Sequence, residues 1–387
     1  MKRHSLFLII SIVVVFTQGC ASTNIANITD VQQFQQDDDE KGIWHQSKEM
    51  EYELRNSGFL YPDQDLADYV NRVLKRLVAD IEEKHQVNLR AYIIQDPYFN
   101  AFVLPNGAMF IHTGLIATLE NEAQLATILG HESVHFLNRH SLRQQRSVIN
   151  KSAFFSFFQM TTAGLGDYGS LARIYGELAV MGTIYGYSRD LEREADQQGY
   201  ELMLKAGYDP FESKKAFELL YESIKDEKKK IPYFFSTHPK VKERIVSFEK
   251  LLANLKNEAP PKFKGEAEYV QHVGRVLLDN ARLSLKCNKL EQALKQIERF
   301  LKAEESSPEA ILLQGQIYAL QNKPDEARDL FSAMLRDYPD YSPVYREIGL
   351  MVYKDKEYQE SNQYFKRYLE LSPNAEDANY IRGYIHE

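Results

Sequence analysis

The sequence is poor in cysteine and carries no excess of basic residues. Its only cysteines are Cys20 and Cys287, so disulfide bonds are excluded as the main source of stability, which must come from packing. Cys287 lies in a helical pattern, where we expect it to be a small buried residue. The net charge of −8 over 387 residues gives no general attraction to nucleic acid, and we expect no nucleic-acid partner.

Long hydrophobic runs are also scarce. Residues 6–16 form an apolar run broken only by Ser11, which is too short for a membrane span of about 20 residues. The run follows the basic residues Lys2 and Arg3, a pattern typical of a secretory signal peptide. We therefore predict that residues 1–20 direct export and form no part of the fold.

The signal region ends in Thr17-Gln18-Gly19-Cys20, which resembles a bacterial lipoprotein cleavage site with Thr17 where such sites usually carry Leu. We favour lipidation of Cys20, because a lipid anchor is the mechanism that requires a cysteine at that place. The prediction is a periplasmic protein that this lipid anchors to the outer membrane. The alternative is ordinary cleavage nearby, after Ala21.

Two other segments before residue 190 are unusual in composition. Residues 21–44 include the acidic run 37–40, which is most simply a solvated linker, so we predict a tether there. Residues 152–187 are apolar and glycine-rich, but polar or charged side chains interrupt every window long enough to span a bilayer. We expect two helices joined by a glycine-rich loop. The alternative is an integral membrane protease in which residues 152–187 cross the membrane.

Hydrophobic periodicity predicts a mostly α fold with a small sheet, an α+β arrangement. Apolar residues at spacings of three and one indicate an amphipathic helix over 66–81. Alternation over 87–93 indicates a strand, and Asn-Gly at 106–107 between two apolar runs indicates a hairpin. Further helices are expected to begin near Glu120 and near Arg189.

The C-terminal part repeats every 34 residues. Glycine, phenylalanine and proline each recur at this period, at Gly315, Gly349 and Gly383, at Phe331 and Phe365, and at Pro339 and Pro373. This register resembles the tetratricopeptide repeat, whose stacked helix pairs form a concave surface for peptides or partner proteins. We predict two clear repeats over 308–341 and 342–375, a degenerate repeat before them and a capping helix after them.

These patterns divide the chain into a mixed domain over 45–255, a linker over 256–264 and an α-helical solenoid over 265–387. The sequence Ala259-Pro260-Pro261 marks the linker. We expect the solenoid helices to have a core of their own, so that a cut near Leu255 leaves a folded first domain.

The motif His131-Glu132-Ser133-Val134-His135 lies in an apolar helical context. A spacing of four puts both imidazoles on one helix face, about 5–6 Å apart at Cβ. Two such nitrogens suit one Zn²⁺, and Glu132 beside them can take a proton from an attacking water. The alternative is a helix with two hydrogen-bonded histidines and a surface glutamate.

A catalytic zinc site of this kind needs a third protein ligand. The metzincin pattern takes a third histidine from the same motif, with a glycine three residues after the second histidine and the third histidine three residues beyond it. Asn138 and Ser141 occupy those positions here, so this pattern fails. His140 points to another helix face and is interpreted as structural or solvated. The gluzincin pattern takes a glutamate from a later helix, where Glu192 and Asp196 are four residues apart and share a face. One of them can bind zinc and the other can hold a ligand histidine, whereas Glu194 points elsewhere.

Together these motifs resemble one family. The first motif, followed by Ser-Arg-x-x-Glu-x-Glu-Ala-Asp at 188–196 and preceded by Asn-Ala-Phe-x-Leu-Pro-x-Gly at 100–107, is similar to the zinc endopeptidases that include HtpX and the CAAX prenyl proteases. The export signal and the C-terminal repeats make the chain most similar to the BepA-like periplasmic branch. The resemblance covers nearly all of residues 45–387, although the repeat array is short.

The resemblance implies a zincin-like domain that binds one Zn²⁺ per chain through His131, His135 and Glu192, with Glu132 as general base and Asp196 behind a ligand. It implies proteolysis of unfolded or misassembled envelope proteins in outer-membrane protein quality control, with the assembly machinery as a partner of the repeats. An alternative of another class is a periplasmic chaperone or scaffold in which the repeats act and the zinc site is dormant.

Two further predictions concern access to the site. His238 matches a histidine that, by resemblance, occupies the open zinc position as a regulatory fourth ligand; donation to the oxyanion and no role at all are the alternatives. An extended substrate is expected to add to an exposed strand beside the catalytic helix, formed by Ala108, Met109, Phe110 and Ile111.

Overall fold

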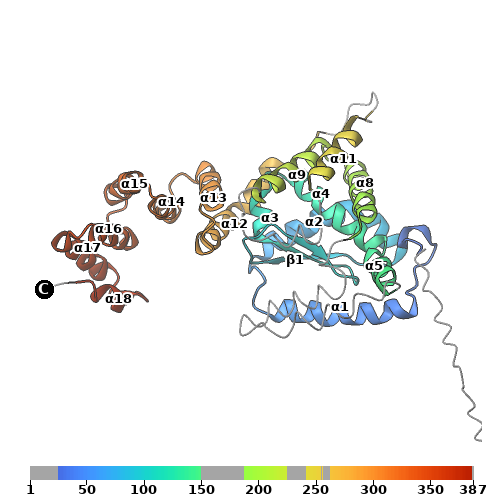
Figure 1. The fold of residues 1–387 in the computed structure, drawn as a ribbon, viewed down its shortest axis with the longest axis horizontal. Coiled ribbons are helices and arrows are strands. Elements are labelled where there is room, and N and C mark those ends of the chain that lie inside the picture. Colours follow the sequence, from blue (N-terminus) through green and yellow to red (C-terminus); the bar gives the residue numbers. More distant parts are fainter. Residues whose placement is uncertain (1–24, 150–186, 225–240, 254, 256–261, 386–387) are drawn as a thin grey trace, which may run out of the picture.

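The computed structural model shows a mostly helical body with a small sheet, from which a row of helix pairs extends to one side (Figure 1). It describes residues 25–149, 187–224, 241–253, 255 and 262–385. Cys20, His238 and nearly all of 152–187 lie outside these ranges, so the predictions made for them stay predictions. Within the described ranges, no helix is both long and apolar enough to cross a bilayer.

The body begins with a short 3-10 helix, Ile28–Asp30. Its α-helices are α1 (Asp38–Asn56), α2 (Gln64–His85), α3 (Thr113–Thr118), α4 (Glu122–Leu137), α5 (His140–Ile149), α8 (Arg189–Lys205), α9 (Phe211–Ile224) and α11 (Val241–Ala253). The row that extends from it consists of α12 (Glu266–Lys286), α13 (Leu290–Ala303), α14 (Pro308–Leu320), α15 (Pro324–Asp337), α16 (Ser342–Lys354), α17 (Tyr358–Leu371) and α18 (Ala378–Arg382).

Local sequence signals place the long helices where the periodicity predicted them. The side chain of Asp63 caps α2 by accepting from the Leu66 N–H, and the apolar face of this helix is buried in the core. Ser188 caps α8 in the same way by accepting from the Leu191 N–H. Each cap satisfies a backbone donor that a helix start leaves without a partner.

Within the part of the chain that the structure describes, the sheet has three strands, β1 (Arg90–Ile94), β2 (Ala101–Val103) and β3 (Ala108–His112), in the order β1-β3-β2. The hairpin of β2 and β3 is confirmed, and Gly107 in its turn has a φ of +83°, which favours glycine. β1 pairs with β3 in parallel. β3 is therefore the central strand.

The prediction that residues 108–111 form an exposed substrate-binding strand is wrong. Neighbouring strands use the main-chain groups of β3 on both sides, which leaves none for an added peptide. All of β3 is buried. The sequence did not reveal this because the parallel pairing with β1 depends on the packing of the intervening chain and not on the local alternation of side chains.

The acidic run 37–40 is not a solvated linker. It forms the first turn of α1, where Asp37 and Glu40 make a capping box. Arg139 donates to the buried Glu40 carboxylate at 2.5 and 3.0 Å, and Arg146 pairs with Asp37 and Asp39 at 2.6 Å. The acidic residues are thus held by arginines more than 90 residues later in the chain, which no local pattern could indicate.

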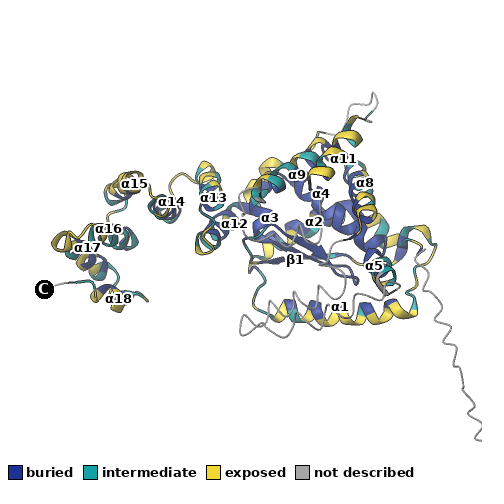
Figure 2. Cartoon of the chain, viewed as in Figure 1, coloured by how far each residue is buried: buried dark blue, intermediate teal, exposed yellow. Residues whose placement is uncertain are grey.

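One continuous core extends from the body into the first helices of the row (Figure 2). α12 packs against α2, α3 and α4, and its Tyr269 is buried and donates to the Ile116 carbonyl at 2.6 Å. Arg299 of α13 donates to the Ala117 and Leu119 carbonyls. The expectation that the helices after residue 265 have a core of their own is therefore wrong for α12 and α13.

The later helices confirm the predicted repeats. A Cβ on Gly315 would lie 2.3 Å from the Phe331 ring, and one on Gly349 would lie 2.6 Å from the Phe365 ring. The glycine and phenylalanine columns of the 34-residue period are thus two halves of one contact between paired helices.

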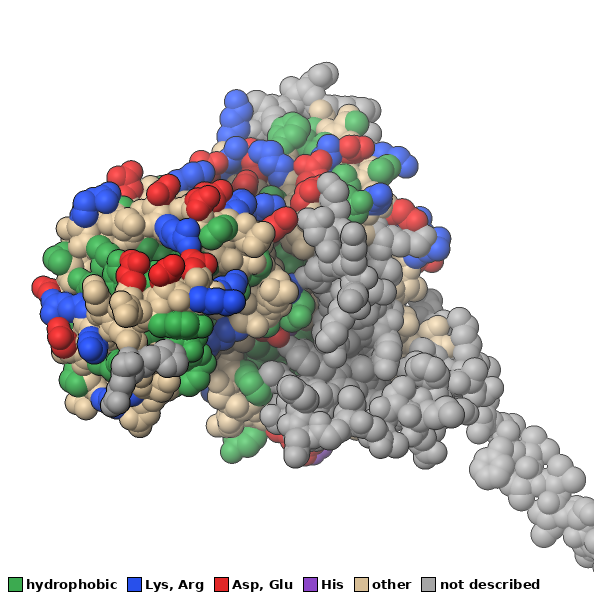
Figure 3. All heavy atoms as spheres, turned by 60° about the vertical axis from the view of Figure 1, so that its left-hand side comes forward, with side chains coloured by type: hydrophobic (Ala, Val, Ile, Leu, Met, Phe, Trp, Pro, Cys, Tyr) green, Lys and Arg blue, Asp and Glu red, His purple; other side chains and the backbone are tan. Residues whose placement is uncertain are grey.

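Cys287 caps the C-terminal end of α12 and is exposed, so its predicted burial is wrong. On the face shown in Figure 3, Lys and Arg of the row lie among Asp and Glu.

Candidate metal centre

The predicted catalytic helix, α4, crosses α8 at a pair of glycines. A Cβ on Gly130 would lie 3.0 Å from the Gly199 carbonyl oxygen, and a Cβ on Gly199 would lie 2.8 Å from the His131 nitrogen. Any side chain at either place would push the two backbones apart. The close crossing brings carboxylates of α8 beside imidazoles of α4.

His131, His135 and Glu192 meet at this crossing, and all three are buried. The two Nε2 atoms are 3.0 Å apart. The Glu192 oxygens lie 3.5 Å from His135 Nε2 and 3.7 Å from His131 Nε2. Ligand atoms at about 2.1 Å from a tetrahedral zinc are separated by about 3.4 Å. The spacings therefore fit one zinc ion, and the structure groups the three residues that the sequence analysis grouped.

Asp196 lies behind the first of these histidines. Its Oδ1 is 3.0 Å from His131 Nδ1, and Arg244 Nη2 lies 3.0 Å from the same nitrogen. Of these two neighbours only the carboxylate can accept a proton from Nδ1, and that arrangement leaves Nε2 for a metal. Burial raises the pKa of Asp196, but the charge of Arg244 and the hydrogen bond with His131 outweigh it and hold the pKa at about 2. Asp196 is thus an ionised acceptor at neutral pH.

Arg244 of α11 completes this side of the centre, although the sequence analysis did not single it out. Its guanidinium donates to the Asp196 carboxylate at 2.5–3.2 Å and lies 3.3 Å from Glu192. The sequence held a signal for it, because Val241, Arg244 and Phe248 have the spacing of one helix face. In the structure all three are buried, and an arginine on a buried face indicates a buried carboxylate partner.

Glu132 follows the first ligand on α4 and is only 1% exposed. Burial raises the pKa of the Tyr187 phenol, and the nearby charge of Glu132 raises it further. Tyr187 in turn stacks on the His135 ring, with the ring centroids 3.9 Å apart. The buried carboxylate of Glu132 therefore lies close enough to Tyr187, which covers the His135 ring, to influence its phenol.

His140 and Glu194 also belong to the surroundings of the centre. His140 is fully buried, and its Nδ1 lies 2.8 Å from His135 Nδ1. Glu194, which the helix pattern assigned to another face, lies 3.6 Å from His140 Nε2. Glu194 lies outside the group of possible ligands. Counting faces along straight helices did not indicate its contact with His140, which depends on the turn between α4 and α5 at Arg139, where φ is +54°.

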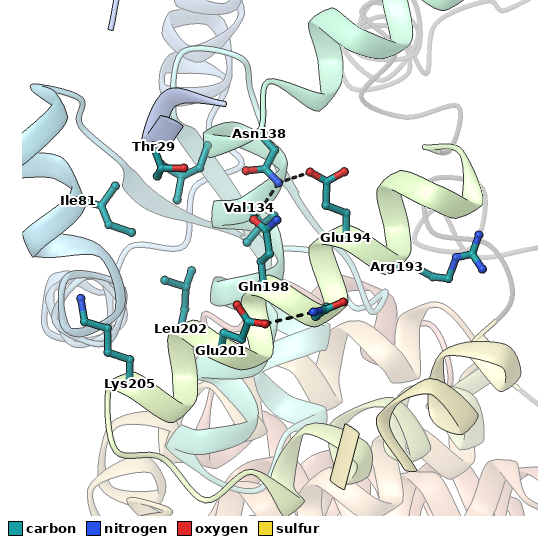
Figure 4. Close-up of a pocket in the computed structure, with 12 residues that line it drawn as sticks. Thr29, Ile81, Val134, Asn138, Arg193, Glu194, Gln198, Glu201, Leu202 and Lys205 are labelled. Carbon is teal, nitrogen blue, oxygen red and sulfur yellow. Dashed lines mark hydrogen bonds between the residues drawn. The ribbon is translucent and has the colours of Figure 1, made fainter. Parts of the chain in front are cut away.

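A pocket of about 620 Å³ opens near the end of α4, where α8 presents residues other than its metal ligand (Figure 4). Its wall includes Asn138, Glu194 and Gln198. The Asn138 amide donates to Glu194 at 2.6 Å and to Gln198 at 2.9 Å. None of the three grouped ligands lines this pocket, so it is distinct from the metal centre.

Two family profiles match the sequence. Peptidase family M48 matches residues 64–252, and the tetratricopeptide repeat matches residues 278–342. The first match contains the grouped ligands, Glu132 and Arg244. The second begins inside α12, which agrees with the degenerate first repeat predicted there.

Three relatives indicate where the similarity lies. The mitochondrial metalloendopeptidase OMA1 of Schizosaccharomyces pombe is 34% identical over 192 residues, which are 49% of this chain and 55% of that protein. The putative beta-barrel assembly-enhancing protease of Vibrio cholerae is 29% identical over 202 residues, and the beta-barrel assembly-enhancing protease of Escherichia coli is 26% identical over 211 residues. Each of these two alignments covers 50% of this chain and 40% of the relative. The chain thus spans about half the length, or less, of the relatives it matches.

Proposed function

We propose that this chain, whose residues 64–252 match peptidase family M48, is a zinc endopeptidase that hydrolyses peptide bonds in unfolded or misassembled proteins of the bacterial envelope. The observation that carries the proposal is the buried set of His131, His135 and Glu192 with Glu132 beside it. Two imidazoles and a carboxylate are a usual ligand set for catalytic zinc. A bound zinc ion supplies Lewis acidity toward the scissile carbonyl.

The chain's own groups supply the remaining chemistry. The Glu132 carboxylate takes a proton from the attacking water and returns it to the leaving amine. The Asp196 carboxylate holds His131 in one orientation, and Tyr187 covers the His135 ring and limits the access of bulk water to it.

An extended substrate is proposed to pair with the outer side of β2. Because the Leu104 N–H donates to the Ala108 carbonyl, alternation along the strand turns the main-chain groups of Ala101 and Val103 away from β3. Within the described residues, no strand pairs with that side. All of β2 is buried, so pairing with a substrate requires the neighbouring chain to move aside. Pairing of this kind reads the backbone more than the side chains, so we expect broad specificity for unfolded segments.

We place this activity in the periplasm, in quality control of outer-membrane proteins. Two relatives bear the name beta-barrel assembly-enhancing protease, and the sequence starts with the pattern of an export signal. The repeat row recruits a substrate or a member of the assembly machinery. The lipid on Cys20 and the regulatory role of His238 belong to the same proposal and rest on sequence alone.

The test measures zinc content and casein cleavage side by side for the parent and Glu132→Gln. We expect one zinc per chain in both proteins. Cleavage should fall at least about 100-fold in the variant, because general acid–base catalysis contributes about 10²–10⁴-fold. Glu201→Gln, at an exposed place on α8, is the matched control and should keep the parent's activity.

Equal cleavage by Glu132→Gln and the parent would show that this carboxylate is not the base. If the parent binds zinc but cleaves no unfolded protein, and Glu132→Gln preserves the cellular function, then the alternative holds. The protein would act as a scaffold through its repeats.

A further inference from the structure

We propose that His140 and Glu194 position the zinc ligand His135 by fixing which of its ring nitrogens carries the proton. The inference rests on the zinc centre of the proposed function, but not on proteolysis by it. In this role His140 touches a ligand and Glu194 acts through His140, so both are positioning residues. Neither residue has a place in the ligand set or the acid–base chemistry described above.

The geometry allows one direction of donation through the pair. His135 turns Nε2 toward His131 and Glu192, so a metal needs the lone pair on that nitrogen. The proton of a neutral His135 is then on Nδ1, which lies 2.8 Å from His140 Nδ1. Of two nitrogens in a hydrogen bond, one donates and the other accepts. His140 Nδ1 must therefore accept, and its own proton lies on Nε2.

Glu194 stands at the far end of this chain of donation. Its Oε2 is 3.6 Å from His140 Nε2, and among the described residues that buried nitrogen has no hydrogen-bond partner. An ionised carboxylate has no proton to donate, so it acts only as a hydrogen-bond acceptor. The ion pair with Arg143 at 3.0 Å keeps the Glu194 carboxylate beside His140 Nε2, and an acceptor at that place favours the proton on the nitrogen that faces it.

Two donors hold the Glu194 carboxylate in place. The Asn138 amide donates to Oε1 at 2.6 Å, and Arg143 donates to both oxygens at 3.0 and 3.1 Å. Asn138 follows directly after α4, the helix that carries His131 and His135. Its contact with Glu194 is visible at the wall of the pocket in Figure 4. The position of Glu194 is therefore tied to the end of α4, close to His135.

The two ligand histidines are thus supported in two different ways. Asp196 contacts His131 directly at 3.0 Å, whereas Glu194 reaches His135 through an intervening imidazole. Partners that orient a metal-binding histidine typically change metal affinity by 10–100-fold when they are lost. One helix, α8, supplies a zinc ligand and the carboxylate that stands at the end of each of these two routes.

The test measures the zinc dissociation constant of the full chain by competition with a chromophoric chelator. His140→Leu should weaken zinc binding by about 10–100-fold and Glu194→Ala by about 10-fold. The double variant should bind as weakly as His140→Leu alone, because Glu194 acts only through His140. His140→Asn should recover most of the affinity, since its Oδ1 takes the place of Nδ1 as an acceptor.

Two controls separate positioning from folding. Glu201→Ala changes an exposed acid of α8 and should leave the dissociation constant unchanged. Thermal unfolding of each metal-free variant reports any loss of folding. The visible spectrum of the Co²⁺ form should change in His140→Leu and return toward that of the parent in His140→Asn, which a purely structural residue would not produce.

Unchanged zinc affinity in a folded His140→Leu protein would overturn the proposal. So would additive effects of His140→Leu and Glu194→Ala, because the carboxylate would then act by another route. A parent that binds no zinc contradicts the zinc centre itself, and with it the proposed function. A parent that binds zinc while all variants equal it contradicts this inference alone.

Discussion

The body and the repeat row are both mostly helical, yet they are stabilised in different ways. In the body, helices distant in sequence share one core and bury ion pairs: the side chains of Arg139 and Glu40 are 8% and 4% exposed. In the row, each helix packs mainly on its neighbours along the chain. The ion pair there between Arg328 and Asp355 leaves both side chains 49% exposed.

The border between the two regions does not follow the repeat period. α12 and α13 form a helix pair at the start of the row, but Tyr269, Val273 and Leu277 of α12 are buried in the core of the body. The period reports only that two helices pair with each other. Which surface a helix pair covers depends on the apolar faces available elsewhere in the molecule. A helix whose sequence belongs to the repeats can therefore be part of the core of the body.

Truncation offers the strongest test of that border. A chain ending at residue 255 lacks α12, and burial of each large apolar side chain of that helix contributes about 1.5–3 kcal/mol. Several such losses approach the whole stability of a domain, about 5–15 kcal/mol. We expect this chain to show no cooperative unfolding and no zinc binding. A chain ending at residue 305 keeps α12 and α13 and should retain both. Equal behaviour of the two truncations would contradict a shared core.

Buried ion pairs of the body should be sensitive to the loss of one partner. Arg139→Ala leaves Glu40 buried without its guanidinium partner, and we expect a cost of about 3–5 kcal/mol in the free energy of unfolding, measured by urea denaturation. The double variant Arg139→Gln with Glu40→Gln removes both charges and should recover part of that loss. A cost for Arg139→Ala below about 1 kcal/mol would place this pair with the exposed pairs of the row.

Acid should weaken the body through Glu212 of α9. Burial raises the pKa of this carboxyl, but hydrogen bonds from Lys215, Asn121, Gln124 and Lys264 outweigh it and lower the pKa from 4.5 to about 2. A lowered carboxyl pKa stabilises the fold above pH 4.5, and this contribution is lost as the pH falls toward 2. The shift corresponds to about 3 kcal/mol at neutral pH.

Glu212→Gln should therefore be less stable than the parent at pH 7, and the difference should shrink as the pH falls from 4.5. Urea denaturation at pH 7, 4.5 and 3 measures it. Glu218→Gln on the same helix, whose Lys214 contact is half-exposed, is the control and should show little dependence on pH. A difference between Glu212→Gln and the parent that stays constant over this range would contradict the lowered pKa.

The smallest effect is expected in the repeat row. Arg328→Ala removes the exposed ion pair with Asp355 between α15 and the end of α16. Exposed pairs contribute about 0–1 kcal/mol, so the unfolding midpoint of the variant should lie close to that of the parent. The difference between the two midpoints should be small at both low and high salt concentration. A cost comparable to that of Arg139→Ala would show that the row depends on its charges as the body does.

Much of the metal centre could be predicted from spacing alone. His131 and His135 share a helix face because four residues make about one turn, and Glu192 and Asp196 share a face for the same reason. Arg244 and the pair His140 and Glu194 were missed in that role. Their contacts depend on how α5 and α11 fold back onto the ligand helices, which is a property of chain turns and packing rather than of spacing.

The sequence by itself determined the helices, the hairpin, the 34-residue repeat and the faces that carry the ligands. These features rest on local periodicity, because helix and strand geometry repeat every few residues. Only the tertiary structure decided that β3 is the central strand, that α12 belongs to the core of the body, and that Gly130 meets Gly199 at the helix crossing. Each of these depends on which distant surfaces can bury one another, and a local pattern can name such a surface without naming its partner.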